Sequence, residues 1–251
     1  MRRVFFVFLL MISIFKIEAR NIYVLSVGIS HYQHLRDLKK AETDATTIAD
    51  LYKTHTTHVT LLRSVQATRD NILTELRRTC NLATEGDILV FFFSGHGGKD
   101  GLCAYDTKNP QTMVRYEEVQ QVIRNCKANN KQLFIDACYS GGLRLSSPST
   151  SHSSSSAETS FTNSQGIMLF LSSRTNEASI ENPWSANGFF TQYLLKGIKG
   201  AADTNRDRII SAKELFTYVS SNVTERTNGK QHPVMWGKFN DNMRIMNWNA
   251  K

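Results

Sequence analysis

Two short glycine-rich motifs in this sequence each contain one side chain able to take part in nucleophilic catalysis. Ser94-Gly95-His96-Gly97 supplies an imidazole, and Asp136-Ala137-Cys138-Tyr139-Ser140-Gly141 supplies a thiol. A thiol with its usual pKa of about 8.5 is a weak nucleophile at neutral pH until a nearby imidazole favours the thiolate. The imidazole can then give its proton to a leaving amine. The pair predicts acyl transfer, with Cys138 as nucleophile and His96 as general base.

Taken singly, each of these residues has a simpler interpretation. A cysteine at the end of a strand is usually an inert buried side chain, and a lone histidine is usually a surface residue. Both motifs, however, directly follow apolar runs that predict strands, at 87–93 and 132–135. The carboxyl ends of parallel strands meet at one edge of a sheet, where such folds bind their ligands. We therefore expect the thiol and the imidazole to face one crevice.

The order of the apolar segments predicts the fold class. Apolar and β-branched runs predict strands at 21–29, 58–62, 87–93, 132–135 and 167–171. Helical spacing of apolar residues predicts helices over 41–53, 116–127, 189–196 and 213–224, and one that begins after Thr68 as N-cap. Strands alternating with helices indicate an α/β fold with a mostly parallel central sheet flanked by helices.

The two motifs, 42 positions apart, closely resemble the caspase/metacaspase clan of cysteine peptidases. The segments 27–45 and 172–195 look like that clan's first strand and helix and its small-subunit segment, so that the likeness covers about residues 21–200. The resemblance implies the caspase-hemoglobinase-like fold with His96 and Cys138 as the catalytic dyad. It also implies an oxyanion hole made by the backbone N–H groups of Gly97 and Cys138.

The residues around the nucleophile resemble metacaspases, including those of bacterial type, more than animal caspases. Animal caspases carry Gln-Ala-Cys, whereas this chain has Asp136-Ala137-Cys138. The metacaspase likeness implies an S1 pocket lined by Asp136, Asp44 and Ser94. Carboxylates in a pocket favour a cationic side chain, which predicts cleavage after Arg or Lys. The alternatives are a solvated helix carboxylate for Asp44 and a structural hydrogen-bond acceptor for Asp136.

The first nineteen residues have the pattern of a signal peptide. Arg2 and Arg3 precede an apolar run at 4–15, and Ala19 is a small residue at the expected cleavage point. The run is shorter than the roughly twenty residues that cross a bilayer, and an uncleaved anchor is the alternative. We expect a secreted or periplasmic protein in which residues 20–251 form one peptidase domain without stable membrane insertion.

The charge and cysteine content of the chain indicate which partners to expect. The formal net charge is +8, but no basic run exceeds two residues, as at Arg77-Arg78, which argues against a nucleic-acid partner. Four cysteines are few for a disulfide framework in a chain of 251 residues. The expected partners are protein or peptide substrates, and the likeness to metacaspases implies a monomer.

Two later segments have distinct patterns. Residues 145–165 are rich in serine and predict a mobile loop, and Arg144, the nearest basic residue after Cys138, is a candidate for self-cleavage. Residues 200–251 predict a C-terminal helical extension containing an EF-hand-like loop. The expected oxygen ligands for calcium in this loop are Asp203, Asn205, Asp207, Ser211 and Glu214.

The calcium loop has an alternative interpretation. Arg208 occupies the sixth position, where the sharp turn of an EF-hand favours glycine. Ser211 can instead be the N-cap of the following helix, with Glu214 completing a capping box. Calcium is therefore an optional ligand in this interpretation, and catalysis by a thiol and an imidazole requires no cofactor.

Together these patterns predict a secreted cysteine endopeptidase that hydrolyses peptide bonds after Arg or Lys through a Cys–His dyad. The alternative from a different class is a catalytically silent caspase-like module that binds a protein partner. A hydrolase or transferase using the same pair on a non-peptide substrate is a further alternative.

Overall fold

The computed structural model describes residues 20–98, 101–137, 166–174, 177, 179–180 and 185–248. Its strands are β1 (Ile22–Gly28), β2 (Val59–Arg63), β3 (Ile88–Ser94), β4 (Gly101–Leu102), β5 (Val114–Arg115), β6 (Asn130–Asp136), β7 (Ile167–Leu171), β8 (Ile209–Ser211), β9 (Val234–Lys238) and β10 (Arg244–Asn247). Its α-helices are α1 (Ala41–Lys53), α2 (Arg69–Leu82), α3 (Tyr116–Asn125), α4 (Phe189–Lys196) and α5 (Ala212–Arg226).

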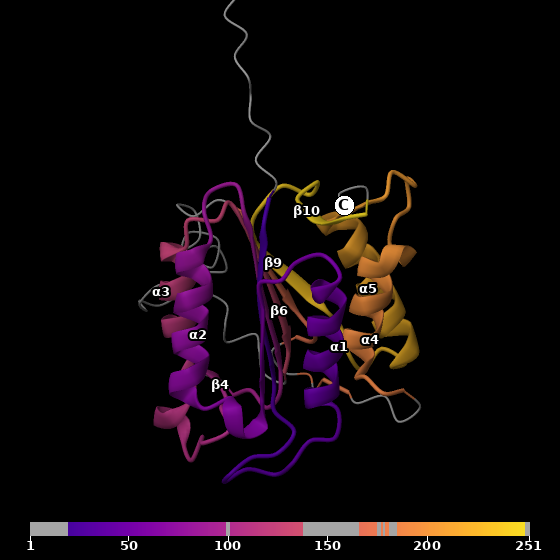
Figure 1. The fold of residues 1–251 in the computed structure, drawn as a ribbon. Coiled ribbons are helices and arrows are strands. Elements are labelled where there is room, and N and C mark those ends of the chain that lie inside the picture. Colours follow the sequence, from indigo (N-terminus) through magenta and orange to yellow (C-terminus); the bar gives the residue numbers. More distant parts are fainter. Residues whose placement is uncertain are drawn as a thin grey trace, which may run out of the picture.

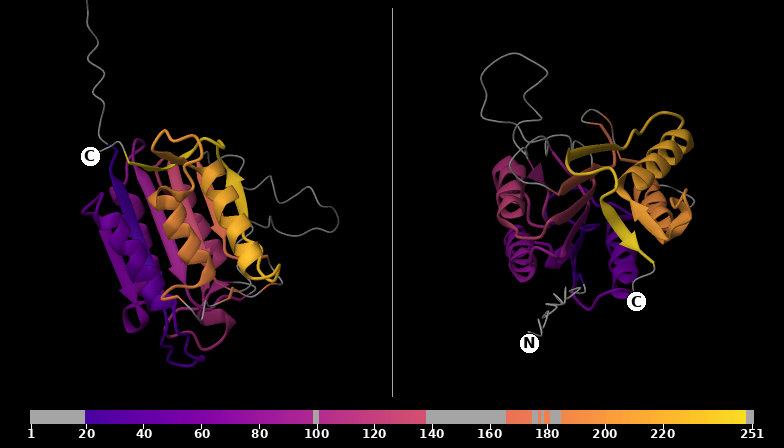
Figure 2. Two further views of the ribbon diagram at one scale, coloured as in Figure 1. Left: turned by 90° about the vertical axis from the view of Figure 1, so that its right-hand side faces the viewer. Right: turned by 90° about the horizontal axis from the view of Figure 1, so that it is seen from above.

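Six strands form a central sheet in the order β2-β1-β3-β6-β7-β9. All neighbours in this sheet pair in parallel except β7 and β9, which are antiparallel. Helices α2 and α3 cover one face, and α1, α4 and α5 cover the other (Figure 1). The view from above shows the same three layers (Figure 2). The fold is the α/β architecture with a mostly parallel sheet that the sequence predicts.

Strand β3 is apolar from Ile88 to Phe93 because both faces of the sheet are covered here. In β3 the side chains alternate: Leu89, Phe91 and Phe93 pack in the core beneath α2 and α3. Ile88, Val90 and Phe92 pack in the core beneath α1, α4 and α5. All seven residues of β3 are buried, so this strand is anchored from both sides before it reaches the glycine-rich segment.

The observed elements follow the predicted ones closely in the first two hundred residues. Strand β7 and helices α1 and α4 have the predicted bounds, and the Thr68 hydroxyl accepts a hydrogen bond from the N–H of Asn71 at the start of α2. The C-terminal segment differs from the expected helical extension. Only α5 is a long helix there, and β9 joins the central sheet beside β7 while β8 pairs with β10. The segment is therefore an integral part of the domain.

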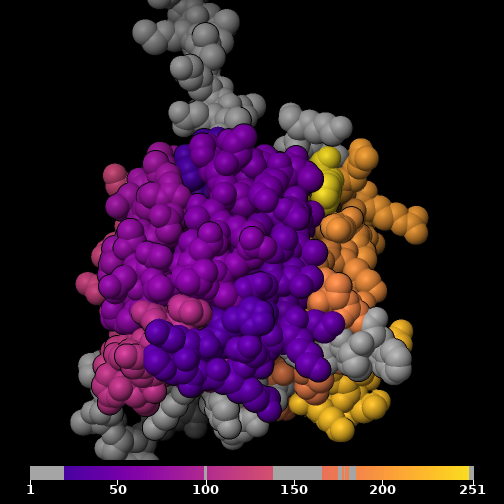
Figure 3. Space-filling model, turned by 60° about the horizontal axis from the view of Figure 1, so that its bottom comes forward, coloured from indigo at the N-terminus to yellow at the C-terminus, as the bar shows by residue number. Residues whose placement is uncertain are grey.

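The register of the sheet aligns the ends of its central strands. Gly28 of β1 pairs with Ser94 of β3, and Ser94 pairs with Asp136 of β6. These three residues form one row at the carboxyl edge, which is the lower edge in Figure 1. The space-filling view brings this edge forward, with the indigo segment between β1 and α1 across part of it (Figure 3).

Within the described part of the chain, no helix is long and apolar enough to cross a membrane.

Gly28 lets α1 begin directly against the end of β1. A Cβ atom at this position would lie 2.3 Å from the carbonyl oxygen of Ala41 and 2.6 Å from the Cβ of Ala45. A main-chain carbonyl cannot move away unless the helix itself shifts. The short distance between strand and helix therefore requires glycine at this position.

We predict that Gly28→Ala lowers the free energy of unfolding by about 2 kcal/mol or more, because overpacking here displaces the first turn of α1. Gly86→Ala is the matched control, since nothing lies within 4 Å of a Cβ at that position. Urea denaturation of the three proteins measures the difference. Equal stabilities would contradict the close-packing argument.

Candidate active site

The imidazole of His96 is oriented by the segment that connects β1 to α1. Its Nε2 atom lies 2.7 Å from the carbonyl oxygen of Arg36, and its backbone N–H donates to the Tyr32 hydroxyl at 2.7 Å. The rings of Tyr32 and His96 lie 4.9 Å apart. Because a carbonyl oxygen only accepts, Nε2 carries the proton of the neutral ring and Nδ1 keeps its lone pair. The ring is therefore set to accept a proton at Nδ1.

The residue before His96 must be small for this arrangement to exist. A Cβ on Gly95 would lie 2.7 Å from the Tyr32 hydroxyl oxygen and 3.0 Å from the ring of Phe93. Burial raises the pKa of Tyr32 far above its ordinary value, so the hydroxyl remains neutral. Tyr32 thus acts as a fixed polar contact for the backbone at His96.

The turn that holds Gly97 is fixed by backbone hydrogen bonds on both sides. The N–H of Cys103 donates to the carbonyl of His96 at 2.9 Å, and the N–H of Gly98 donates to the carbonyl of Gly101 at 2.9 Å. Gly97 itself forms an isolated antiparallel bridge with Leu102. The predicted oxyanion donor therefore lies on an anchored turn directly after His96.

A buried carboxylate from α1 lies beside the end of β3. The Ser94 hydroxyl donates to Oδ2 of Asp44 at 3.1 Å. Oδ1 of Asp44 accepts from the side-chain amide of Asn187 at 2.8 Å and from the N–H of Gly188 at 3.1 Å. Only 2% of Asp44 is exposed. The interpretation of Asp44 as a solvated helix carboxylate does not hold.

A second buried carboxylate, Asp136, ends β6. The hydroxyl of Thr191 donates to its Oδ2 at 2.8 Å, and the hydroxyl of Ser179 donates to its Oδ1. A Cβ on Gly188 would lie 3.5 Å from Oδ2 of Asp136 and 3.6 Å from Oδ2 of Asp44. Both carboxylates therefore face the same small volume in front of Gly188. Asp136 also accepts hydrogen bonds, as the alternative interpretation of this residue as a structural acceptor expects.

Two neighbouring buried acids strongly disfavour a state in which both are charged. Burial raises the pKa of Asp44 to about 8, and the negative charge of Asp136 adds to the effect. Burial likewise raises the pKa of Asp136. The pair therefore retains a proton near neutral pH in the absence of a cation. A cationic group placed between the two oxygens would replace that proton.

Both carboxylates and the imidazole line one cavity of about 660 Å³ at the carboxyl edge of the sheet. Its walls come from the segment 36–41, from the ends of β3 and β6, and from residues 179, 180 and 188. Of the predicted site residues, Asp44, Ser94, His96 and Asp136 meet here. Gly97 follows directly in the chain, and Cys138 lies outside the described residues, two positions after Asp136.

Comparisons with known proteins agree with this architecture. Residues 22–243 match the caspase domain family. The chain belongs to the caspase domain family. A structure from Geobacter sulfurreducens matches with a TM-score of 0.64 and 17% identity over 88% of this chain and 94% of that chain. Caspase-1 from Spodoptera frugiperda matches with a TM-score of 0.64 and 18% identity over 88% and 90% of the two chains.

These similarities define the fold and the general chemistry. At these identities the solved structures show a shared caspase-like fold, and no curated protein sequence matches significantly. Membership of the caspase family indicates cysteine peptidase activity of the hydrolase class, with proteins as substrates. The finer properties of this caspase-like chain depend on its own residues.

Several polar residues that contact Asp44 and Asp136, the two carboxylates of what we call the acidic pocket, were not predicted from the sequence. Asn187, Ser179 and Thr191 hold the two carboxylates, and their sequence motifs give no sign of this role. Their partners lie 143, 43 and 55 positions away in the chain. Only the packing of the segment after β7 against α1 and β6 brings them to the site.

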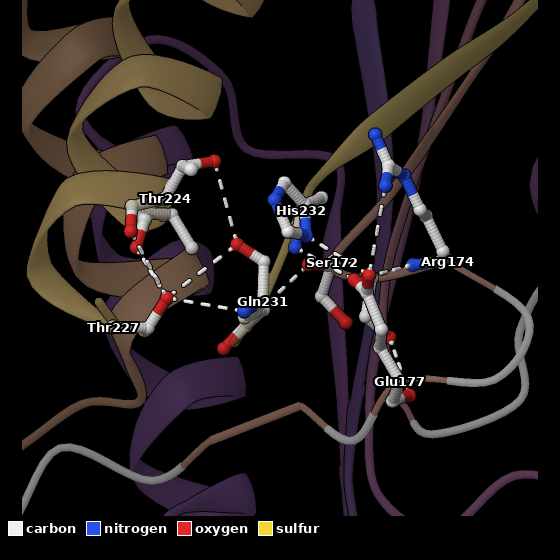
Figure 4. Close-up of polar contacts among 9 residues, drawn as sticks. Ser172, Arg174, Glu177, Thr224, Thr227, Gln231 and His232 are labelled. Atoms are coloured by element: carbon white, nitrogen blue, oxygen red, sulfur yellow. Dashed lines mark hydrogen bonds and ion pairs between the residues drawn. The ribbon is translucent and has the colours of Figure 1, made fainter. Parts of the chain in front are cut away.

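Gln231 connects this pocket wall to the C-terminal segment. Its buried side chain accepts from the N–H of Ile180 at 2.9 Å and donates to the carbonyl of Ser172 at 2.9 Å. A longer contact of 3.4 Å reaches the hydroxyl of Ser179, which contacts Asp136. Figure 4 shows Gln231 between Thr224 and Thr227 on one side and Ser172 on the other.

The neighbouring residue extends the same attachment. The His232 backbone N–H donates to Glu177 at 2.8 Å, and its ring Nδ1 lies 2.9 Å from the other carboxylate oxygen of Glu177 (Figure 4). Arg174 lies 3.9 Å from Glu177 on the other side. Thus Ser172, Glu177 and Ile180 are attached to the chain after α5 by polar contacts.

The EF-hand-like loop begins α5 with a capping box. Ser211 accepts from the N–H of Glu214 at 3.3 Å and donates to Oε2 of Glu214 through its N–H and hydroxyl. Oε1 of Glu214 accepts from Thr204. Arg208 adopts a left-handed φ of 65° at the sixth position, which is uncommon for a residue other than glycine. The alternative interpretation of Ser211 and Glu214 therefore describes this structure.

The remaining predicted ligands of this loop also bond to protein groups. Asp203 accepts from the N–H of Arg208, Asn205 accepts from the N–H of Asp207, and Asp207 accepts from the N–H of Ile209. The described residues contain no group of three or more His, Cys, Asp or Glu side chains arranged to hold a metal. In the structure described here these ligands do not converge, and calcium binding stays a prediction.

We predict that Gln231→Leu lowers the free energy of unfolding by about 2–4 kcal/mol, because it leaves the buried carbonyl of Ser172 and the partly buried N–H of Ile180 unpaired. Gln121→Leu makes the same chemical change at an exposed position on α3 and serves as the control. Denaturant unfolding compares the two variants. A loss no larger than that of the control would show that the Gln231 contacts contribute little.

Proposed function

We propose that this caspase-family chain is a cysteine endopeptidase of metacaspase-like specificity that cleaves peptide bonds after Arg or Lys. The observation that carries the proposal is the pair of buried carboxylates, Asp44 and Asp136, in the same cavity as His96. A pocket for Asp would present cations beside Gly188, whereas Asp44 and Asp136 face that volume. The basic residues of the cavity wall, Arg36, Lys39 and Lys40, come from the segment between β1 and α1. A cavity floor with two acids favours a guanidinium or ammonium group instead.

In the proposed reaction, Nδ1 of His96 removes the proton from the Cys138 thiol while Nε2–H stays bonded to the carbonyl of Arg36. The thiolate attacks the scissile carbonyl carbon, and the backbone N–H groups of Gly97 and Cys138 stabilise the resulting oxyanion. Collapse of the tetrahedral intermediate breaks the C–N bond, and the imidazolium protonates the leaving amine. Water then attacks the thioester, gives a proton to His96, and releases the acid and the thiol.

This reaction requires no metal or organic cofactor, because the imidazole, the thiol and the backbone supply every proton transfer and charge stabilisation. Calcium binding at the 203–214 loop remains a separate prediction. We further propose that the chain is secreted or periplasmic and works as a monomer. The nineteen N-terminal residues on which the first of these points depends lie outside the described residues.

We predict that Cys138→Ala and His96→Ala each lower peptide hydrolysis by about a thousandfold or more, because each removes one half of the dyad. His34→Ala, at an exposed position on the segment between β1 and α1, is the matched control for His96. Initial rates on fluorogenic peptides ending in Arg, Lys and Asp provide the measurement.

Cleavage after Arg or Lys, but not after Asp, is the expected pattern for the unmodified chain. Preference for Asp would exclude the proposed specificity. Binding of a peptide without any hydrolysis would favour the catalytically silent module.

We predict that Asp44→Asn lowers kcat/KM for an arginyl peptide by about tenfold to a hundredfold, mainly through KM, because one of the two carboxylates loses its charge. Asp50→Asn removes an exposed carboxylate from the same helix and is the control. An unchanged KM in Asp44→Asn would contradict a role for Asp44 in binding the substrate's cation.

The same carboxylate gives the reaction a pH dependence. Because the pKa of Asp44 in the folded state is raised to about 8, its charge in the free enzyme grows as pH rises through that value. Affinity for a cationic substrate should therefore increase over this range. The free energy of unfolding changes in the opposite direction. The stabilising contribution of protonated Asp44 is complete below the pKa that this carboxyl has in the unfolded chain, and it is lost as pH rises through about 8.

A further inference from the structure

Two of the buried cysteines lie against each other between α2 and the start of β6, at the edge of the sheet opposite the cavity. Cys80 is in the last turn of α2, and Cys126 directly follows α3. The Cys126 thiol donates to the carbonyl oxygen of Cys80, with 3.7 Å between sulfur and oxygen, and the two thiols affect each other's pKa. Their exposed fractions are 4% and 5%. Helices α2 and α3, which carry them, lie side by side (Figure 1).

A buried cation stands beside the two sulfurs. Lys131 of β6 is 4% exposed, and its charge favours the thiolate form of both cysteines. The hydrogen bond from the Cys80 thiol, with help from Lys131, lowers the pKa of Cys126 to about 7. The same thiol–thiol bond raises the pKa of Cys80. The pair therefore combines one acidic thiol, Cys126, with a partner that stays protonated.

The pair borders a cavity on the side of Cys80. A cavity of about 280 Å³ between α2 and α3 has Cys80 in its wall, together with Arg77, Asn81, Gln121, Val122 and Asn125. None of these residues lines the cavity that holds His96. Chemistry at the two cysteines therefore takes place away from the peptidase site and does not depend on the proposed activity.

We propose that Cys80 and Cys126 form a redox-active pair that closes to an intramolecular disulfide when the chain meets a small-molecule disulfide. The Cys126 thiolate attacks one sulfur of the oxidant, forms a mixed disulfide and releases one thiolate. The Cys80 thiol then loses its proton to solvent, and its sulfur attacks the Cys126 sulfur and displaces the second thiolate. The protein loses two protons and two electrons, and the oxidant is reduced to two thiols.

The bond would join the end of α2 to the end of α3. The chain enclosed between the two cysteines includes β3 and the glycine-rich segment at His96. Closing this loop restricts the unfolded chain, so the oxidised protein should be the more stable form. The redox state would thus set the stability of the part of the domain that carries the imidazole, without changing any side chain at the cavity.

The test uses the full chain with Cys138→Ala, so that the predicted nucleophile cannot react. The reduced protein is incubated with oxidised glutathione under conditions in which it stays folded. Its intact mass and its peptide map without reduction are then measured. We expect a loss of two hydrogen masses, one cross-linked peptide pair joining residues 80 and 126, and a rise in Tm of about 5 °C or more that dithiothreitol reverses.

Two variants complete the design. Adding Cys103→Ser, which changes the third described cysteine, should leave the mass loss intact, whereas adding Cys126→Ser should abolish it. The proposal is overturned if the folded protein keeps both thiols, if Cys103 appears in the cross-link, or if the oxidised protein is less stable. Should Cys126→Ser fail to fold, the peptide map of the parent protein decides the question.

Discussion

The in-register pairing of three parallel strands is the constraint on which the site depends. Gly28, Ser94 and Asp136 stand opposite one another across β1, β3 and β6, and adjacent strands of a sheet lie about 4.8 Å apart. A shift of one residue in any of these strands would turn its side chains to the opposite face. The burial of β3 on both faces opposes such a shift, because it would exchange the two halves of the core. The hydrophobic layers therefore fix the distance between the site's polar groups.

Placing two carboxyl groups close together in the acidic pocket costs free energy. Asp44 and Asp136 are buried close together, and their raised pKa values express the free energy that their full ionisation would require. Hydrogen bonds from neutral donors, among them Ser94 and Thr191, offset part of that cost and orient the oxygens. The donors that hold the two carboxylates are hydroxyl groups, a side-chain amide and a backbone N–H, none of which carries a positive charge. Such a pocket is suited to a cation brought by the substrate.

The last fifth of the chain contributes to this pocket from a distance. Strand β9 completes the sheet, and Gln231, just before it, bonds to residues 172 and 180 on the pocket side. Through Ser179, this contact continues to Asp136. The C-terminal segment therefore belongs to the support of the active site, and its packing is coupled to the geometry of the carboxylates.

The sequence by itself determined the elements and the two motifs, because apolar runs buried on both faces and apolar residues at helical spacing are local patterns. The dyad remains a sequence inference, since Cys138 lies outside the described residues. Strand β9 could not be predicted, because its residues are half-buried or exposed and only pairing with β7 makes them a strand. Likewise, nothing local marks Asn187 or Gln231, whose amides find partners far away in the chain. The raised pKa of Asp44 was decided only by tertiary packing, which removes the carboxyl from water and places it near Asp136.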